Sequence, residues 1–292
     1  MLSRARLLAL VACCVVQSSA MAQGVASAPA FAQVNQTSLR YQLAGRGLRT
    51  IVLLHELGMS LESWDDVFGD LSRDNRVLRY DLRGFGLSEK LRGAVTIDDE
   101  VDDLRGLLDH LGITEPVTVV GGALGGAVAL RFAAAQPQRV AAVMALSPAA
   151  DVPAANRAAF LARAARMERL GVRADVDVTR EDTYVPALRI GHEDRYARFL
   201  AMQYANDPVS MAETLRMVAI TEWASTWPRI QCPAWFVAVR HYKGRPVESV
   251  RAIASAVPHG HFEVLESGPF VPVQAPELLL PLLRTFLQAT GR

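Results

Sequence analysis

The 292-residue sequence has little of what marks several large protein classes. It contains 3 Cys, 20 Gly and 15 Pro, which excludes a disulfide framework and a collagen-like repeat. Its 31 Lys and Arg nearly balance its 30 Asp and Glu, so no strong field attracts nucleic acid or an anionic membrane surface. A hydrophobic fraction of 51% with a net charge of +1 excludes general disorder. The chain is therefore globular and long enough to bury a sizeable core.

The N-terminal segment carries the pattern of a targeting signal. Arg4 and Arg6 precede an apolar run from Leu7 to Val16, which is too short to span a bilayer as a helix. An A-x-A pattern ends at Ala22, so we expect residues 1–22 to be a signal peptide and the protein to be periplasmic or secreted. A lipoprotein signal that presents Cys13 for lipidation is the alternative.

Beyond this segment, strand-like and helix-like stretches alternate regularly. Short apolar runs of β-forming residues predict buried strands at 50–54, 76–80, 116–120, 140–145, 234–239 and 261–265, and an extended pair is expected at 34–43. Amphipathic or small apolar helices are expected at 97–110, 126–135 and 276–288. This alternation predicts an α/β fold with a mostly parallel central sheet flanked by helices.

Residues 151–227 interrupt the alternation. The segment is helical in pattern, rich in Ala, Arg and Met, and contains no run typical of a buried strand. We expect it to form a helical lid over the edge where parallel strands end, which is where α/β proteins bind ligands. The core is then built from residues 23–150 and 228–292.

Four segments resemble the α/β-hydrolase fold, and within it the small lactone and ester hydrolases typified by 3-oxoadipate enol-lactonase. They are IVLLHELG (51–58), YDLRGFGLS (80–88), VVGGALGGAVAL (119–130) and LESGPFVPVQAPE (265–277). The resemblance covers residues 34–288, and it implies the same fold with a helical lid.

The resemblance also implies where a catalytic triad should lie, and all three positions differ here. Family members carry a nucleophile between two glycines on a sharp strand-to-helix turn, and this chain has Ala123 there. The expected carboxylate is replaced by Tyr242, and the expected histidine, in a G-H-F context, by Pro269. A methyl group cannot attack a carbonyl, so we do not expect standard serine-hydrolase activity.

The region of the oxyanion hole is altered in the same direction. Its backbone donors should lie near Glu56 or Leu57 and at Leu124. Glu56 replaces the usual glycine, and a carboxylate at this place would oppose a developing oxyanion. No other G-x-S-x-G exists, and the sequence places no histidine to activate Ser147.

Two functions follow from these replacements. The first is a non-hydrolytic protein whose lidded pocket binds a small apolar or lactone-like ligand, or a partner protein. The alternative is an enzyme of the same fold, a lyase, isomerase or atypical ester or lactone hydrolase, that uses acid–base chemistry from His241, Tyr242, His55 or Glu56. Residues expected in the ligand site are His55, Glu56, Leu57, Ala123, Leu124, Ser147, His241, Tyr242 and Phe270.

We expect neither a metal nor a cofactor. His259 and His261 alternate along a strand, a spacing that can ligate a metal, but they precede the last strand and so lie at the edge opposite the pocket. We expect both to be structural or surface residues, and we expect no nucleic-acid partner and no membrane span.

Overall fold

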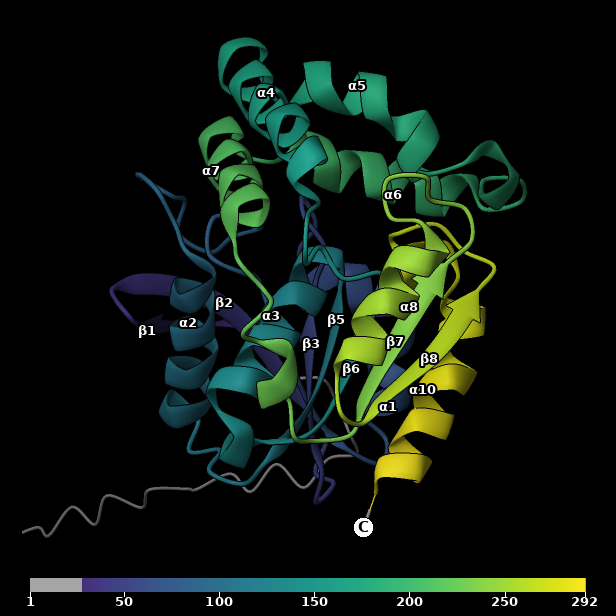
Figure 1. The fold of residues 1–292 in the computed structure, drawn as a ribbon. Coiled ribbons are helices and arrows are strands. Elements are labelled where there is room, and N and C mark those ends of the chain that lie inside the picture. The colour runs from purple at the N-terminus through teal and green to yellow at the C-terminus, as the bar shows by residue number, and fades with distance from the viewer. Residues whose placement is uncertain (1–27, 292) are drawn as a thin grey trace, which may run out of the picture.

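The computed structural model describes residues 28–291 of the chain, and an eight-stranded sheet forms its centre (Figure 1). The strand order is β1-β2-β4-β3-β5-β6-β7-β8. β2 (Thr37–Ala44) runs antiparallel to β1 (Ala30–Val34) and to β4 (Arg76–Tyr80), and all other neighbouring strands are parallel. The expected fold class, a mostly parallel sheet flanked by helices, is confirmed.

The remaining strands are β3 (Thr50–Leu54), β5 (Val117–Gly122), β6 (Val140–Leu146), β7 (Ala234–Val239) and β8 (Gly260–Leu265). Every residue of β3 and β5 is buried, because helices cover both faces of the sheet. This explains why these strands are read in the sequence as continuous apolar runs rather than as alternating patterns.

Helices pack on both faces. α2 (Ile97–His110), α3 (Ala123–Ala135) and α8 (Val247–Ala256) contribute to one core cluster, whereas α1 (Asp65–Leu71) and α10 (Pro276–Thr290) contribute to a second cluster on the other face. Short helical turns are η1 (Leu61–Trp64), η2 (Pro137–Arg139), η3 (Pro186–Leu188), η4 (Trp227–Arg229) and α9 (Val271–Gln274).

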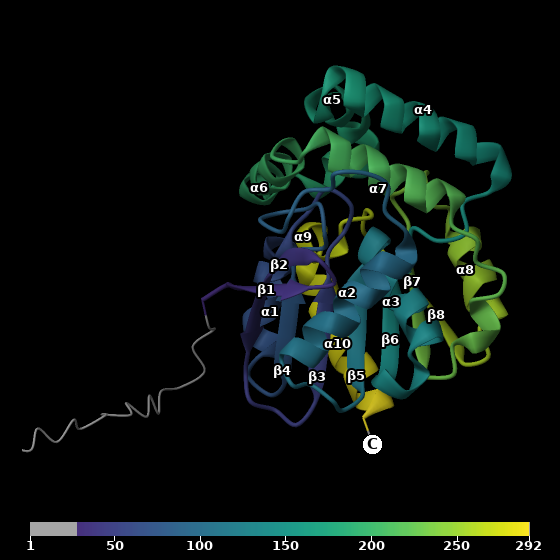
Figure 2. The same cartoon turned by 90° about the vertical axis from the view of Figure 1, so that its left-hand side faces the viewer.

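The expected lid segment contains four helices that lie above the ends of the parallel strands (Figures 1 and 2). They are α4 (Ala154–Leu170), α5 (Val172–Thr183), α6 (Glu193–Tyr204) and α7 (Pro208–Ile220). An aromatic contact ties them to the core, because the Phe199 ring of α6 packs edge-on against the Phe270 ring at 4.8 Å between centroids. We refer to α4–α7 as the lid.

The observed elements differ from the expected ones mainly at their ends. β5 runs on to Gly122 and α3 starts at Ala123, so the strand passes into the helix with no loop, whereas a gap at 121–125 was expected. A tight turn joins β1 to β2, and its residues Asn35 and Gln36 have φ angles of 44° and 60°. Thr96 begins α2 with a capping box that it forms with Asp99.

The N-terminal signal expected at residues 1–22, including Cys13, lies outside the described residues. Within residues 28–291, no helix combines the length and the apolar character needed to cross a bilayer. Cys232 in this part of the chain is a free thiol whose pKa burial raises to about 11.

Asp81, directly after β4, holds together the loops at this edge of the sheet. Its carboxylate accepts hydrogen bonds from the Arg40 guanidinium at 2.6 and 3.1 Å, and from the backbone N–H groups of Leu61 and Leu87, both at 2.7 Å. The carboxylate is fully buried, and the Arg40 side chain is 8% exposed. Asp81 is therefore the one acceptor through which three separate segments are fixed.

Asp81→Asn should lower the free energy of unfolding by about 3 kcal/mol, because the buried Arg40 keeps only its ion pair with the half-exposed Glu62 and the amide turns an N–H donor toward a backbone N–H. Urea denaturation measures the change. Asp102→Asn is the matched control, since Asp102 pairs with Arg105 at the surface and should contribute no more than about 0.5 kcal/mol. Equal effects of the two substitutions would contradict the role given to Asp81.

Candidate functional site

A strained turn between β5 and α3 stands at the centre of the site. Ala123 has a φ of 41°, a backbone conformation that costs a residue with a side chain on the order of 1 kcal/mol or more. Glycines permit the turn: a Cβ at Gly121 would clash with the backbone of Gly125, and a Cβ at Gly125 would clash with the backbone carbonyl of Leu54. The start of α3 therefore lies directly against β3, and the backbone N–H of Gly125 donates to the carbonyl of His55 at 3.1 Å.

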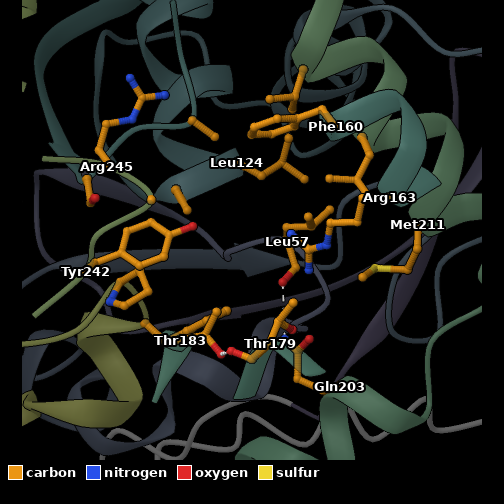
Figure 3. A pocket seen from close by; sticks show the side chains of 18 of the residues that line it. Leu57, Leu124, Phe160, Arg163, Thr179, Thr183, Gln203, Met211, Tyr242 and Arg245 are labelled. Atoms are coloured by element: carbon orange, nitrogen blue, oxygen red, sulfur yellow. Dashed lines mark hydrogen bonds between the residues drawn. The ribbon is translucent and has the colours of Figure 1, made fainter. Parts of the chain in front are cut away.

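A pocket lies between this turn and the lid (Figure 3). Its cavity volume of about 90 Å³ is several times the ~10–15 Å³ that a cavity needs to hold one water, which suits a small organic molecule. The core contributes Leu57, Ala123, Leu124, Ser147, Ala149, Tyr242, Gly244, Arg245, Pro269 and Phe270. The lid contributes Phe160, Arg163, Val176, Thr179, Thr183, Phe199, Gln203, Met211, Leu215 and Val218.

The structure brings most of the sequence-predicted ligand residues to this one pocket. Leu57, Ala123, Leu124, Ser147, Tyr242 and Phe270 all line it, and so does Pro269. Figure 3 shows the Tyr242 ring projecting into the pocket from the side opposite Arg163 and Met211. Three predicted residues, His55, Glu56 and His241, are not among its lining residues.

His55 is fully buried, and backbone groups engage both of its ring nitrogens. The N–H of Leu82 donates to Nε2 at 2.9 Å, so Nδ1 carries the proton and donates to the carbonyl of Glu56 at 2.8 Å. Burial lowers the pKa of the imidazole, which favours this neutral form. The ring thus ties the loop after β3 to the loop after β4, and no lone pair is left to accept a substrate proton.

Glu56 is also fully buried, and its side chain lies against Gly122, where an added Cβ would come within 2.6 Å of Oε1. The Ser63 hydroxyl is the polar side chain that acts on its carboxyl group, although within residues 28–291 neither carboxyl oxygen meets the distance and angle of a hydrogen bond. Burial raises the pKa of this carboxyl to about 8, so the group is largely protonated at neutral pH. The expectation that a carboxylate opposes an oxyanion here is therefore corrected, because desolvation keeps the acid neutral.

His241 points away from the pocket. Its side chain is 40% exposed, and Nε2 lies 3.3 Å from a carboxylate oxygen of Glu266, which is 60% exposed. The backbone N–H of His241 donates to the carbonyl of Ser267 at 3.0 Å. The chain turns at Arg240 and His241 directly after β7, so the side chains of His241 and Tyr242 leave the loop in different directions.

Sequence reasoning missed the polar residues that the lid supplies. Gln203 of α6 donates from Nε2 to the carbonyl of Leu57 at 3.2 Å and so joins the lid to the loop after β3. Arg163, Thr179 and Thr183 line the same pocket (Figure 3). Arg245 was missed as well. It lies three residues after Tyr242, in the loop that follows a predicted strand, and this position could have indicated that it lies near the pocket.

Known proteins match the chain over most of its length. A family model described as alpha/beta hydrolase fold matches residues 49–230. The crystal structure of the enol-lactonase from Burkholderia xenovorans LB400 superposes with a TM-score of 0.84 at 24% identity, and the match covers 89% of this chain and 100% of that one. At this identity the likeness shows the fold alone.

Two curated relatives come from bacteria. The dihydrolipoyllysine-residue acetyltransferase component of the acetoin cleaving system of Pseudomonas putida is 35% identical over 128 residues, which are 44% of this chain and 34% of that protein. The match thus spans about a third of this relative's length. The putative carbamate hydrolase RutD of Stutzerimonas stutzeri is 27% identical over 236 residues, 79% of this chain and 89% of its own.

The family match extends over more than half of the chain, and the sheet order, the strained turn after β5 and the inserted helices agree with it. This chain belongs to the α/β-hydrolase fold family.

Proposed function

We propose that this chain is a non-hydrolytic member of the family that binds a small apolar or lactone-like molecule in the pocket under the lid. The observation that carries the proposal is Ala123 on the strained turn in the pocket wall, where the resemblance places the nucleophile. Tyr242 and Pro269, at the positions where the resemblance places the acid and the base, line the same pocket. The three replaced positions therefore lie around one pocket.

The pocket offers no obvious substitute for the missing chemistry. None of its lining residues is a histidine, an aspartate or a glutamate. Ser147 has a buried hydroxyl with no hydrogen-bond partner within residues 28–291, but no imidazole accompanies it in the pocket wall. A serine without an adjacent base is a weak nucleophile. We extend the proposal to the setting: residues 1–22 direct the protein to the periplasm or the exterior.

Ala123→Ser should leave hydrolysis of 4-nitrophenyl acetate within roughly twofold of the rate with unaltered protein, because a hydroxyl at the turn still lacks a base and an orienting acid. The triple variant Ala123→Ser, Tyr242→Asp and Pro269→His is the comparator, since it restores all three groups around one pocket. We expect turnover from the triple variant alone. Saturable turnover by the single variant would contradict the proposal.

An enzymatic function is the second candidate, and the comparisons favour it over binding alone. The matched proteins are named as a putative carbamate hydrolase, an enol-lactonase and the acetyltransferase component of an acetoin cleaving system. The geometry narrows the acid–base groups, because of His241, Tyr242, His55 and Glu56 only Tyr242 lines the pocket. In this function the Tyr242 phenol would transfer the proton.

A screen of esters, lactones and enol acids with the purified protein tests this candidate. If turnover is found, Tyr242→Phe should lower kcat by about 100-fold, which is typical of a lost general acid or base. His241→Ala is the matched control and should leave kcat within roughly twofold, since this side chain lies outside the pocket. Activity that survives Tyr242→Phe would remove Tyr242 from the mechanism.

Glu56 makes the stability of the protein depend on pH. Its carboxyl loses the proton near pH 4.5 in the unfolded chain but near pH 8 in the folded one. Between these values the folded state holds the extra proton, so its stability falls by up to ~1.4 kcal/mol per pH unit as the pH rises. Below pH 4.5 both states are protonated and the loss disappears.

Glu56→Gln should therefore unfold at the same urea concentration as the unaltered protein near pH 4, and be more stable by on the order of 3 kcal/mol at pH 7. The amide keeps the shape of the neutral acid and cannot ionise. Urea midpoints measured from pH 4 to pH 8 provide the comparison. A difference that is constant across this range would show that Glu56 is not the titrating group.

A further inference from the structure

Arg245 is a buried cation without a partner. It lies in the loop between β7 and α8, is 8% exposed, and belongs to the pocket wall beside Tyr242 (Figure 3). Within residues 28–291, no side chain forms a hydrogen bond or an ion pair with its guanidinium. Buried arginines are ordinarily paired, because removing an unpaired charge from water costs several kcal/mol.

The charges around the pocket leave this cation uncompensated. Arg163, the other cation in the lining, shares the buried Asp175 with Arg166, so one carboxylate offsets part of the charge of both guanidinium groups. No acidic residue lines the pocket. The groups that act on Arg245 electrostatically are Tyr242 and the exposed Asp151, and neither forms an ion pair with it.

A second donor in the same wall also lacks a partner. Ser147, at the end of β6, has a φ of 44°, and its buried hydroxyl makes no hydrogen bond within the described part of the chain. Both Ser147 and Arg245 line the pocket. A guanidinium offers a planar fork of N–H donors that matches a carboxylate, and a hydroxyl can donate one further hydrogen bond to the same group.

The other walls of the pocket restrict the kind of molecule that could bring a carboxylate to Arg245. Leu57, Leu124, Phe160, Met211 and Leu215 supply apolar surface, and the small cavity excludes a long chain. A carboxylate places two oxygens beside Arg245 and Ser147, whereas a phosphate would bring further polar oxygens against the apolar walls, where they would lack hydrogen-bond partners. The chemistry of the site therefore selects a monocarboxylate over a phosphate.

We propose that Arg245, assisted by Ser147, is a subsite for the carboxylate of a small and otherwise apolar acid that binds in the pocket. The inference rests on the proposed function, because it specifies the ligand of the same pocket. It applies equally to a ligand that is only bound and to one that is also converted, such as an ester or lactone that carries a free carboxylate.

The test compares hexanoate, hexanamide and inorganic phosphate by isothermal titration calorimetry with the unaltered protein and four variants. Hexanoate should bind at least about 10-fold more tightly than hexanamide, and phosphate should bind more weakly than hexanoate, since a charge-assisted pair to Arg is worth roughly that factor or more. Arg245→Gln should remove the preference for hexanoate while the affinity for hexanamide changes less than about threefold. Arg245→Lys should retain part of the preference, and Ser147→Ala should lower it by roughly threefold.

Arg284→Gln is the matched control, because Arg284 is 59% exposed on α10 and lies away from this pocket. It should bind all three probes as the unaltered protein does. Thermal unfolding of each variant checks that it is folded, and Arg245→Gln should not be less stable, since it removes an unpaired buried charge.

The outcomes test the carboxylate subsite and the proposed small-ligand function separately. If hexanamide binds and hexanoate binds no better, or if Arg245→Gln weakens both equally, the carboxylate subsite is wrong and the pocket remains a ligand site. Tighter binding of phosphate than of hexanoate would also overturn the carboxylate. If neither organic probe binds, both the subsite and the proposed small-ligand function are wrong.

Discussion

The close approach of α3 to β3 is the contact on which the rest of the site depends. It exists because Gly121 and Gly125 have no side chains that would hold the two elements apart. Because α3 starts directly at the end of β5 and also packs against β3, the chain turns sharply at Ala123, where φ is 41°. The turn lifts this residue into the pocket wall, so a packing constraint within the core determines which side chain faces the ligand.

The loops around this turn are fixed by polar groups that do not themselves reach the pocket. His55 connects two loops through backbone hydrogen bonds at both ring nitrogens, and Asp81 connects three segments through one carboxylate. Glu56 is enclosed beside the turn as a neutral acid. Residues that look catalytic in type thus stabilise the frame, while Tyr242, Ser147 and Arg245 are the polar groups that the core presents to a ligand.

The family relationship and the residues of the pocket support different functions. The chain shares its family with a relative named as a putative carbamate hydrolase and its fold with an enol-lactonase. In this chain the turn carries a methyl group, and the pocket wall carries two arginines but no acidic residue or histidine. Such a wall supports the anion subsite that we propose.

The sequence by itself determined the fold class, the order of the buried strands and the three unusual residues Ala123, Tyr242 and Pro269. These follow from local patterns, since apolar runs, glycine spacing and turn residues act over a few positions. The ends of the helices and strands were harder to predict from the sequence. β5 continues through two glycines because β3 and β6 pair with it on either side.

Only the tertiary structure decided which side chains share the pocket. His241 and Tyr242 are neighbours in sequence but face opposite sides of one loop, and the faces of the lid helices that turn inward depend on their packing against the core. The burial that neutralises Glu56 and leaves Arg245 without a partner arises from many distant segments at once. Desolvation is a property of the assembled interior, so no local pattern in the chain encodes it.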